Sequence, residues 1–243
     1  MTDIKRAMVL AAGFGVRLRP ITDTIPKPLV QVLGRTLIDR TIDRLHEGGV
    51  ETFVVNTHHL GEKIHAHLEK RDDVKILFSP EDEILETGGG IANALDHFGN
   101  DPFFACNGDT LWLNGLQDAV NRMVRHWDGD KMDALLMLHS TVDAYGYEGY
   151  GDFCVDALGA LSRRPEGEVS PYLFTGVQIL HPRLFKGAPE GPFSLNVLYD
   201  KAIESDRLYG IVHDGEWFHV GTPEALDEAE DYMRKRFSGI KHR

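Results

Sequence analysis

The chain has 243 residues, of which 42% are apolar and 26% are charged, so it can bury a substantial core as one α/β domain. Its formal net charge of −12 argues against a nucleic-acid or anionic-membrane surface, which would need clustered Lys and Arg, and favours a small-molecule partner. No apolar run could span a bilayer, the N-terminal stretch has no signal-peptide pattern, and two cysteines cannot form a disulfide framework, so we expect a cytoplasmic protein.

Short apolar runs alternate with amphipathic stretches along the first part of the chain, a pattern typical of strands connected by helices in a mostly parallel sheet. Strands are predicted at 7–11, 52–56, 74–78, 103–106 and 134–138. Helices are predicted from 37 until Gly48-Gly49, at 62–70, at 91–98 and at 116–127. Residues 1–138 should therefore form a doubly wound half, with its ligand crevice at the carboxyl ends of the strands.

Residues 139–243 have a different texture, because glycines and tyrosines interrupt short strand-like pieces between 145 and 159. We expect hairpins there, then a strand at 175–180, a helix at 197–205 and a closing helix from Pro223. The whole chain, 1–243, is predicted to be a single domain. Its fold class is α/β: a Rossmann-like three-layer sandwich with a mostly parallel mixed sheet and a small β-rich portion that covers the site.

The strongest motif follows the first strand and reads LAAGFGVRL at 10–18, with PKPL at 26–29. Gly13 and Gly15 allow close backbone approach, so that successive N–H groups can hold phosphate oxygens. Arg17 adds a planar fork suited to a pyrophosphate, and Lys27 adds a point charge. A bare Gly-x-Gly would more often be a simple turn, but the full set favours phosphate binding. The dinucleotide fingerprint and the Walker loop are both excluded by the residues that follow.

The segment LAAGFGVRLRPITDTIPKPL resembles the signature of the sugar-phosphate nucleotidylyltransferases. Further matches cover nearly the whole chain: ETGGG at 86–90, NGD at 107–109, FTG at 174–176 and VGTP at 220–223. The resemblance implies an enzyme that transfers a nucleoside monophosphate from a nucleoside triphosphate to a sugar 1-phosphate and releases pyrophosphate. Such catalysis depends on positioning and charge neutralisation and needs no covalent nucleophile.

Within that family, the short length and the stretches ETGGGI, FTG, HP and FSLN most resemble N-acetylmuramate 1-phosphate uridylyltransferases of cell-wall recycling. The expected substrates are then UTP and N-acetylmuramate 1-phosphate. Mannose-1-phosphate guanylyltransferases, or enzymes for another hexose 1-phosphate, are the alternative. A regulatory homologue that binds a nucleotide sugar without turnover is the non-enzyme alternative. The sequence does not determine the base, the sugar or the oligomeric state.

The resemblance also implies which residues act. Arg17, Lys27 and Asp109 are the expected catalytic residues. Nucleotide contacts are expected from Leu10, Ala11, Ala12, Gly13, Gly15, Val16, Arg17, Lys27, Glu81, Thr87, Gly88 and Gly89. Sugar contacts are expected from Asn107, Gly151, Thr175, Gly176 and Asn196. Arg164 stands where many members have a Lys in Glu-Lys-Pro, either as its replacement or as a solvated loop residue.

The metal site shows one departure from the family. Asp109 matches the usual metal-binding carboxylate, and Mg²⁺ prefers such oxygen ligands beside phosphates. Members usually carry a second Asp before Val-Gly-Thr, where this chain has His219. Two interpretations stay open: His219 is a metal ligand, which would make Mn²⁺ an alternative to Mg²⁺, or it only hydrogen-bonds nearby. Other histidines, His58-His59, His65 and His67, are expected to be solvated, and Trp112 and Trp127 to lie in the core.

Overall fold

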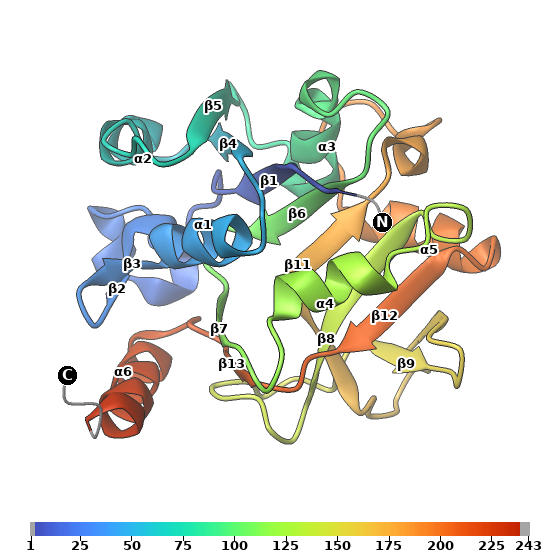
Figure 1. Ribbon diagram of the computed structural model, residues 1–243. Coiled ribbons are helices and arrows are strands. Elements are labelled where there is room, and N and C mark those ends of the chain that lie inside the picture. Colours follow the sequence, from blue (N-terminus) through green and yellow to red (C-terminus); the bar gives the residue numbers. More distant parts are fainter. Residues whose placement is uncertain (1–2, 239–243) are drawn as a thin grey trace.

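The computed structural model describes residues 3–238 and centres on one nine-stranded mixed sheet (Figure 1). Seven strands follow the order β10-β9-β11-β6-β1-β4-β5, and β8 and β12 extend from the other side of β11. The strands are β1 (Arg6–Leu10), β4 (Thr52–Thr57), β5 (Lys75–Pro80), β6 (Phe103–Asn107), β8 (Ala134–Ser140), β9 (Phe153–Val155), β10 (Leu161–Arg163), β11 (Tyr172–Leu180) and β12 (Leu208–Val212).

The described residues form six α-helices, of which α1 to α5 pack against this sheet. They are α1 (Leu37–Glu47), α2 (Gly61–Leu68), α3 (Glu86–Asn93), α4 (Ala119–His126), α5 (Asn196–Glu204) and α6 (Pro223–Phe237). Smaller elements are β2 (Gln31–Val32), β3 (Arg35–Thr36), β7 (Leu111–Leu113), β13 (Glu216–Phe218), and the 3₁₀ turns η1 (Val16–Leu18), η2 (Ile21–Asp23), η3 (Lys27–Leu29), η4 (Leu95–His97) and η5 (Pro182–Phe185).

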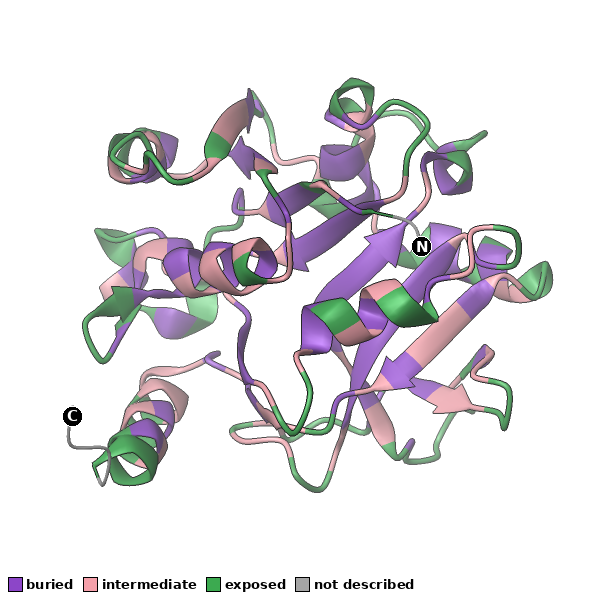
Figure 2. Ribbon diagram, viewed as in Figure 1, coloured by how far each residue is buried: buried purple, intermediate pink, exposed green. Residues whose placement is uncertain are grey.

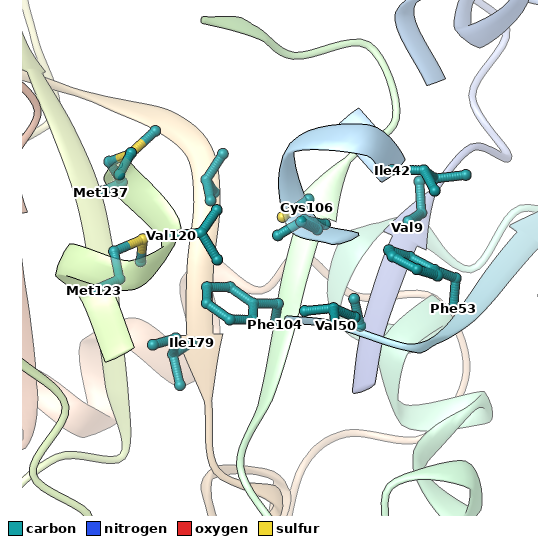
Figure 3. Packing of buried hydrophobic residues seen from close by; sticks show 14 of the residues in the cluster. Val9, Ile42, Val50, Phe53, Phe104, Cys106, Val120, Met123, Met137 and Ile179 are labelled. Carbon is teal, nitrogen blue, oxygen red and sulfur yellow. The ribbon is translucent and has the colours of Figure 1, made fainter. Parts of the chain in front are cut away.

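The strands β6, β1, β4 and β5 are parallel, and their side chains alternate between two hydrophobic clusters. In β1, Ala7 and Val9 belong to one cluster and Met8 to the other. Helices α1, α2 and α4 contribute to the first cluster, which Figure 3 shows around Phe104 and Val9, while α3 and α5 contribute to the second. Because both faces are covered, the inner strands are almost continuously buried (Figure 2). The predicted three-layer α/β fold is confirmed.

The order of the strands corrects one prediction. The strand at 134–138 was expected to complete the first half, but β11 lies between β6 and β8 and is antiparallel to both. β8 pairs in parallel with β12, a strand that the sequence did not reveal. The segments 1–138 and 139–243 therefore share one sheet, because a late strand inserts beside an early one.

Several element boundaries also differ from the predictions. The helix expected at 91–98 begins at Glu86 as α3 and continues only as η4, so the glycine run is inside a helix. The helix expected at 116–127 begins at Ala119, because the Asp118 side chain caps it through the Asn121 N–H. The predicted hairpin after 138 is confirmed by the antiparallel pair β9 and β10.

A third cluster joins α6 to the short strands β7 and β13 and to the segment that carries the glycine motif. Leu18 from η1, Phe218 from β13 and Met233 from α6 are all buried in it. Thr222 caps α6 by accepting a hydrogen bond from the Ala225 N–H, and Pro223 follows at the first helical position. This packing holds residues 219–222 beside the glycine loop.

Candidate active site

The carboxyl ends of three parallel strands meet at one edge of the sheet. Leu10 ends β1 and lies in register with Asn56 of β4 on one side and with Asn107 of β6 on the other. A cavity of about 370 Å³ opens at this edge. Its walls are Leu10, Ala11, Ala12, Gly13, Gly15, Val16, Arg17, Lys27, Pro28, Asn56, Glu81, Ile84, Glu86, Thr87, Asn107, Asp109 and Gly221.

The two glycines of the loop are required for different reasons. Gly15 has φ +62°, and a Cβ there would come within 2.9 Å of the Lys27 Cβ, so this glycine lets the chain fold back on itself. The Thr22 hydroxyl donates to the Gly15 carbonyl and fixes that turn. Gly13 has no protein atom within 4 Å of an added Cβ and faces open space. Protein packing therefore does not explain Gly13, whereas close approach of a ligand would.

Two pairs of polar side chains stand at the mouth of the cavity. The Lys27 ammonium lies 2.5 Å from Asp109 Oδ2, and the Lys27 side chain is only 14% exposed. Arg17, which is exposed, lies 3.2 Å through one guanidinium nitrogen from His219 Nε2. The site thus holds its two cations against one carboxylate and one imidazole. The phosphates of a ligand could replace Asp109 and His219 as the partners of these cations, so that neither cation would be left without a partner.

His219 is half-buried, and the charges of its neighbours shift its pKa. Burial lowers the pKa of this imidazole, and the positive charges of Arg17 and Lys27 lower it further, while Asp109 acts in the opposite direction. A neutral ring can accept the Arg17 hydrogen bond at Nε2. Gly221 leaves room for the ring, since a Cβ there would lie 2.5 Å from His219 Nε2. Both interpretations of His219 stay open, because the same lone pair could bind a metal ion.

The donors for a divalent metal ion are few. Within residues 3–238, no group of three or more His, Cys, Asp or Glu side chains is arranged to hold a metal ion. Asp109 and His219 both line a second cavity of about 210 Å³ that also contains Arg17, Lys27 and Asn107. Two protein donors fit an ion that takes its remaining ligands from phosphates and water, as Mg²⁺ commonly does. The assignment of the metal to Asp109 and His219 stays a prediction.

Asn56 is a residue that the sequence did not single out. Its Oδ1 accepts a hydrogen bond of 2.7 Å from the Ala11 N–H, and its Nδ2 donates to Glu81 Oε1 at 2.7 Å. The other Glu81 oxygen accepts from the Leu85 N–H at 3.0 Å. Asn56 thereby joins the segment behind the glycine loop to the buried carboxylate at the far end of the cavity. No local motif marks it, because its partners come from two other segments.

The glycine run at 88–90 has a packing role that differs from the expected contact with the nucleotide. A Cβ on Gly88 would collide with the Phe193 ring and one on Gly89 with the Gly191 carbonyl. The N–H groups of Gly88 and Gly89 donate to the Phe193 carbonyl. Neither residue lines the 370 Å³ cavity. Nucleotide contacts by Gly88 and Gly89 stay a prediction, while their lack of side chains is explained by the segment that precedes α5.

Gly90 and Thr87 connect this helix to the cavity more directly. A Cβ on Gly90 would lie 2.7 Å from Glu81 Oε1 and 2.8 Å from Asn56 Nδ2, so the third glycine makes space for that pair. Thr87 lines the cavity, and its hydroxyl accepts a hydrogen bond from the Leu195 N–H at 2.9 Å. The helix α3 is therefore fixed both to the Asn56–Glu81 pair and to the start of α5.

The expected sugar residues are less closely grouped. Asn107 lines both cavities and Thr175 lines the smaller one. Gly176, at φ +86° in a bulge of β11, leaves room for the Asn107 side chain. The Thr175 hydroxyl is already used, since it donates to the Met137 carbonyl. Gly151 and Asn196 lie outside the linings of both cavities, so a direct sugar contact by these residues stays a prediction.

The histidines expected to be solvated are in fact partly packed. His58 Nδ1 bonds the Glu81 carbonyl at 2.8 Å, His65 stacks on Phe78, and His67 Nε2 lies 2.8 Å from Asp39. The expectation of solvation was wrong because it ignored neighbours from other segments. Trp112 and Trp127 are buried in the first cluster, as predicted.

Comparisons with known proteins place these features in context. The family model described as nucleotidyl transferase matches residues 6–236. An N-acetylmuramate α-1-phosphate uridylyltransferase of Caulobacter vibrioides is 41% identical over 93% of this chain and 96% of its own length. One of Neisseria meningitidis serogroup B is 36% identical over the same shares. A UDP-glucose pyrophosphorylase solved with UDP-glucose superimposes with a TM-score of 0.80 at 18% identity, covering 96% of this chain and 99% of its own, which shows the shared fold.

Proposed function

The chain belongs to the nucleotidyl transferase family, and we propose that it transfers the uridylyl group of UTP to N-acetylmuramate α-1-phosphate. A phosphate oxygen of the sugar attacks the α-phosphorus of UTP, the bond to the bridging oxygen breaks, and pyrophosphate leaves with the electron pair. The product is UDP-N-acetylmuramate. Such an activity belongs to nucleotide-sugar biosynthesis and peptidoglycan recycling, and its phosphorylated substrates favour a cytoplasmic location.

One structural observation carries the chemical part of this proposal: Lys27 and Arg17 stand together, each held by a partner, at the mouth of the cavity. On substrate binding, Lys27 would exchange Asp109 for the α-phosphate or the sugar phosphate, and Arg17 would hold the leaving phosphates. The protein would then supply position and positive charge where negative charge develops. Identity over nearly the whole chain supports the particular substrates.

Glu81 is the proposed contact for the base. Each of its oxygens already accepts one hydrogen bond, and each has a further lone pair. A carboxylate that accepts hydrogen bonds suits the N3–H of uracil, a donor that cytosine lacks at that ring position. Guanine also offers an N–H at the corresponding edge, and guanylyl transfer to mannose 1-phosphate is therefore the alternative that an assay must separate.

The direct test is pyrophosphate release measured over a matrix of the four nucleoside triphosphates and several sugar 1-phosphates. We expect the highest kcat/KM with UTP and N-acetylmuramate α-1-phosphate. A higher value with GTP and mannose 1-phosphate would replace the proposed substrates. Tight binding without pyrophosphate release for any pair would contradict the transfer reaction itself.

We propose a divalent metal ion as cofactor, Mg²⁺ or, because of the imidazole, Mn²⁺, held by Asp109 and His219. The ion would supply positive charge against the phosphates. Replacing His219 by Asp provides a second hard oxygen ligand, so we expect His219→Asp to be activated at lower Mg²⁺ concentration than the wild type, with the Mn²⁺ curve changed less. Titration of activity with each metal measures this. Unchanged curves for both metals would exclude His219 as a ligand and leave it as the partner of Arg17.

A further inference from the structure

N-acetylmuramate 1-phosphate carries two acidic groups on its sugar ring, at C1 and C3. One is the 1-phosphate, and the other is the carboxylate of the lactyl ether, which N-acetylglucosamine 1-phosphate lacks. Arg17 and Lys27, the proposed phosphate contacts, line the 370 Å³ cavity. The lactyl carboxylate would be recognised best by the planar guanidinium of an arginine, which can donate two parallel hydrogen bonds.

We propose that Arg163, the last residue of β10, recognises the lactyl carboxylate, an inference that rests on the proposed function. Arg163 donates to the Asn196 side-chain oxygen and to the Asn196 carbonyl, each at 3.1 Å. Asn196 is one of the residues that the family resemblance implies for the sugar. Arg163 therefore lies on the sugar side of the molecule and contacts a predicted member of that site.

The buried ring of Tyr199 lies near both Arg163 and Phe174, a residue of the smaller cavity. The Arg163 guanidinium carbon lies 4.9 Å from the centre of the Phe153 ring and 5.9 Å from that of Tyr199. Tyr199 is edge-on to Phe174 with ring centres 6.1 Å apart, and Phe174 lines the smaller cavity together with Asn107 and Asp109. In the proposed pose, a pyranose whose phosphate lies near Lys27 and Asp109 would extend over Phe174 with its lactyl group directed to Arg163.

The guanidinium is well oriented but weakly neutralised. The aromatic rings and Asn196 hold its plane. Its counterion is Asp200, whose Oδ1 lies 2.6 Å from Arg163 Nε and whose side chain is 57% exposed. Exposed ion pairs contribute little and exchange readily, so a substrate carboxylate can share or replace Asp200. Neighbouring Arg164 differs, because it donates to the backbone carbonyls of Gly151, Pro165 and Glu168 and so holds its own loop together.

The test compares two sugars that differ only in the lactyl ether. With UTP as co-substrate, kcat/KM is measured for N-acetylmuramate 1-phosphate and N-acetylglucosamine 1-phosphate in the wild type, Arg163→Gln, Arg163→Lys and a control, Arg125→Gln. Arg125 is an exposed arginine of α4 that bonds only Gln117 among the described side chains. If the neutral sugar is not turned over, its inhibition constant replaces its kcat/KM.

We expect Arg163→Gln to lower the preference for the acidic sugar about 10- to 100-fold, through KM for that sugar, with KM for UTP unchanged. Arg163→Lys should retain part of the preference, and Arg125→Gln all of it. Equal losses for both sugars, or an unchanged preference in Arg163→Gln and Arg163→Lys, would overturn the role of Arg163. A wild type that uses another sugar 1-phosphate but not N-acetylmuramate 1-phosphate would instead refute the proposed function.

Discussion

The proposed nucleotide end and the proposed sugar end of the site are built in different ways. At the nucleotide end, side chains such as Asn56 and Glu81 are buried, bonded to each other and attached to the ends of parallel strands. At the sugar end, Asn196 and Arg163 are exposed or half-exposed and bond mainly to each other and to Asp200. Under the proposed function, phosphate and base binding would depend on the rigid sheet, whereas sugar choice would depend on short strands and loops that can vary without disturbing the core.

The largest effect on activity is expected at Lys27, which lines both the 370 Å³ and the 210 Å³ cavity and which we call the junction of the two ends. Lys27→Met removes the cation beside Asp109 and leaves that carboxylate unpaired, so charge on the transferred phosphate is no longer neutralised. We expect kcat/KM to fall about 10²- to 10³-fold, as when one stabilising donor is lost from an active site. Steady-state pyrophosphate release measures it.

The control for that change is Lys131→Met, which removes a lysine that is 70% exposed and pairs only with Asp128 among the described residues. It should leave activity unchanged. A fall of less than tenfold in Lys27→Met would mean that the junction does not carry the chemistry and that the two ends must be reinterpreted.

Replacing one asparagine at each end compares the stability of the two ends directly. Asn56→Ala leaves the Ala11 N–H and Glu81 Oε1 without their partner, so we expect a loss of about 1–3 kcal/mol in the free energy of unfolding and a higher KM for UTP. Asn196→Ala removes only exposed contacts and should change stability by less than about 0.5 kcal/mol. Urea unfolding of both variants measures this. Equal stability losses would show that the sugar end is as rigid as the nucleotide end.

A pair of glycines separates folding from ligand contact within the nucleotide end. Gly15→Ala places a side chain at φ +62° and against Lys27, and should cost about 1–2 kcal/mol of stability. Gly13→Ala meets no protein atom, so we expect stability within about 0.5 kcal/mol of the wild type but a higher KM for UTP. Calorimetry and kinetics on the two variants separate the effects. If Gly13→Ala binds UTP normally, the ligand does not approach the backbone there.

The difference between local and long-range contacts decides which site residues the sequence could predict. The proposed nucleotide end follows from local order, because the strand, the glycines, Arg17 and Lys27 lie within one short segment, and continuous apolar runs mark the buried strands β1 and β6. The sequence could not identify Asn56 as a site residue, since its role depends on hydrogen bonds to two segments that are distant in the chain.

The insertion of β11 between β6 and β8 could not be predicted either. The apolar run of β11 is compatible with a parallel or an antiparallel neighbour, and its place depends on packing across the whole sheet. The glycine run at 88–90 shows the same limit at one site. The sequence predicts nucleotide contacts by Gly88 and Gly89, but only the structure identifies Phe193 and Gly191 as the residues packed against them.

The smallest effect is expected from His219, and it depends on pH. Burial, with Arg17 and Lys27, lowers the pKa of this ring below its ordinary value of 6.5, so the unfolded chain binds its proton more readily than the folded one. Its contribution to stability is therefore complete above pH 6.5 and is lost as the pH falls from there through the lowered pKa. His219→Gln keeps a hydrogen-bond acceptor for Arg17 but does not titrate. We expect the variant to lose less stability than the wild type between pH 7 and pH 5, as measured by urea unfolding at both values. Identical losses would mean that the ring is protonated as easily in the folded site as in water, and that Arg17 and Lys27 do not act on it.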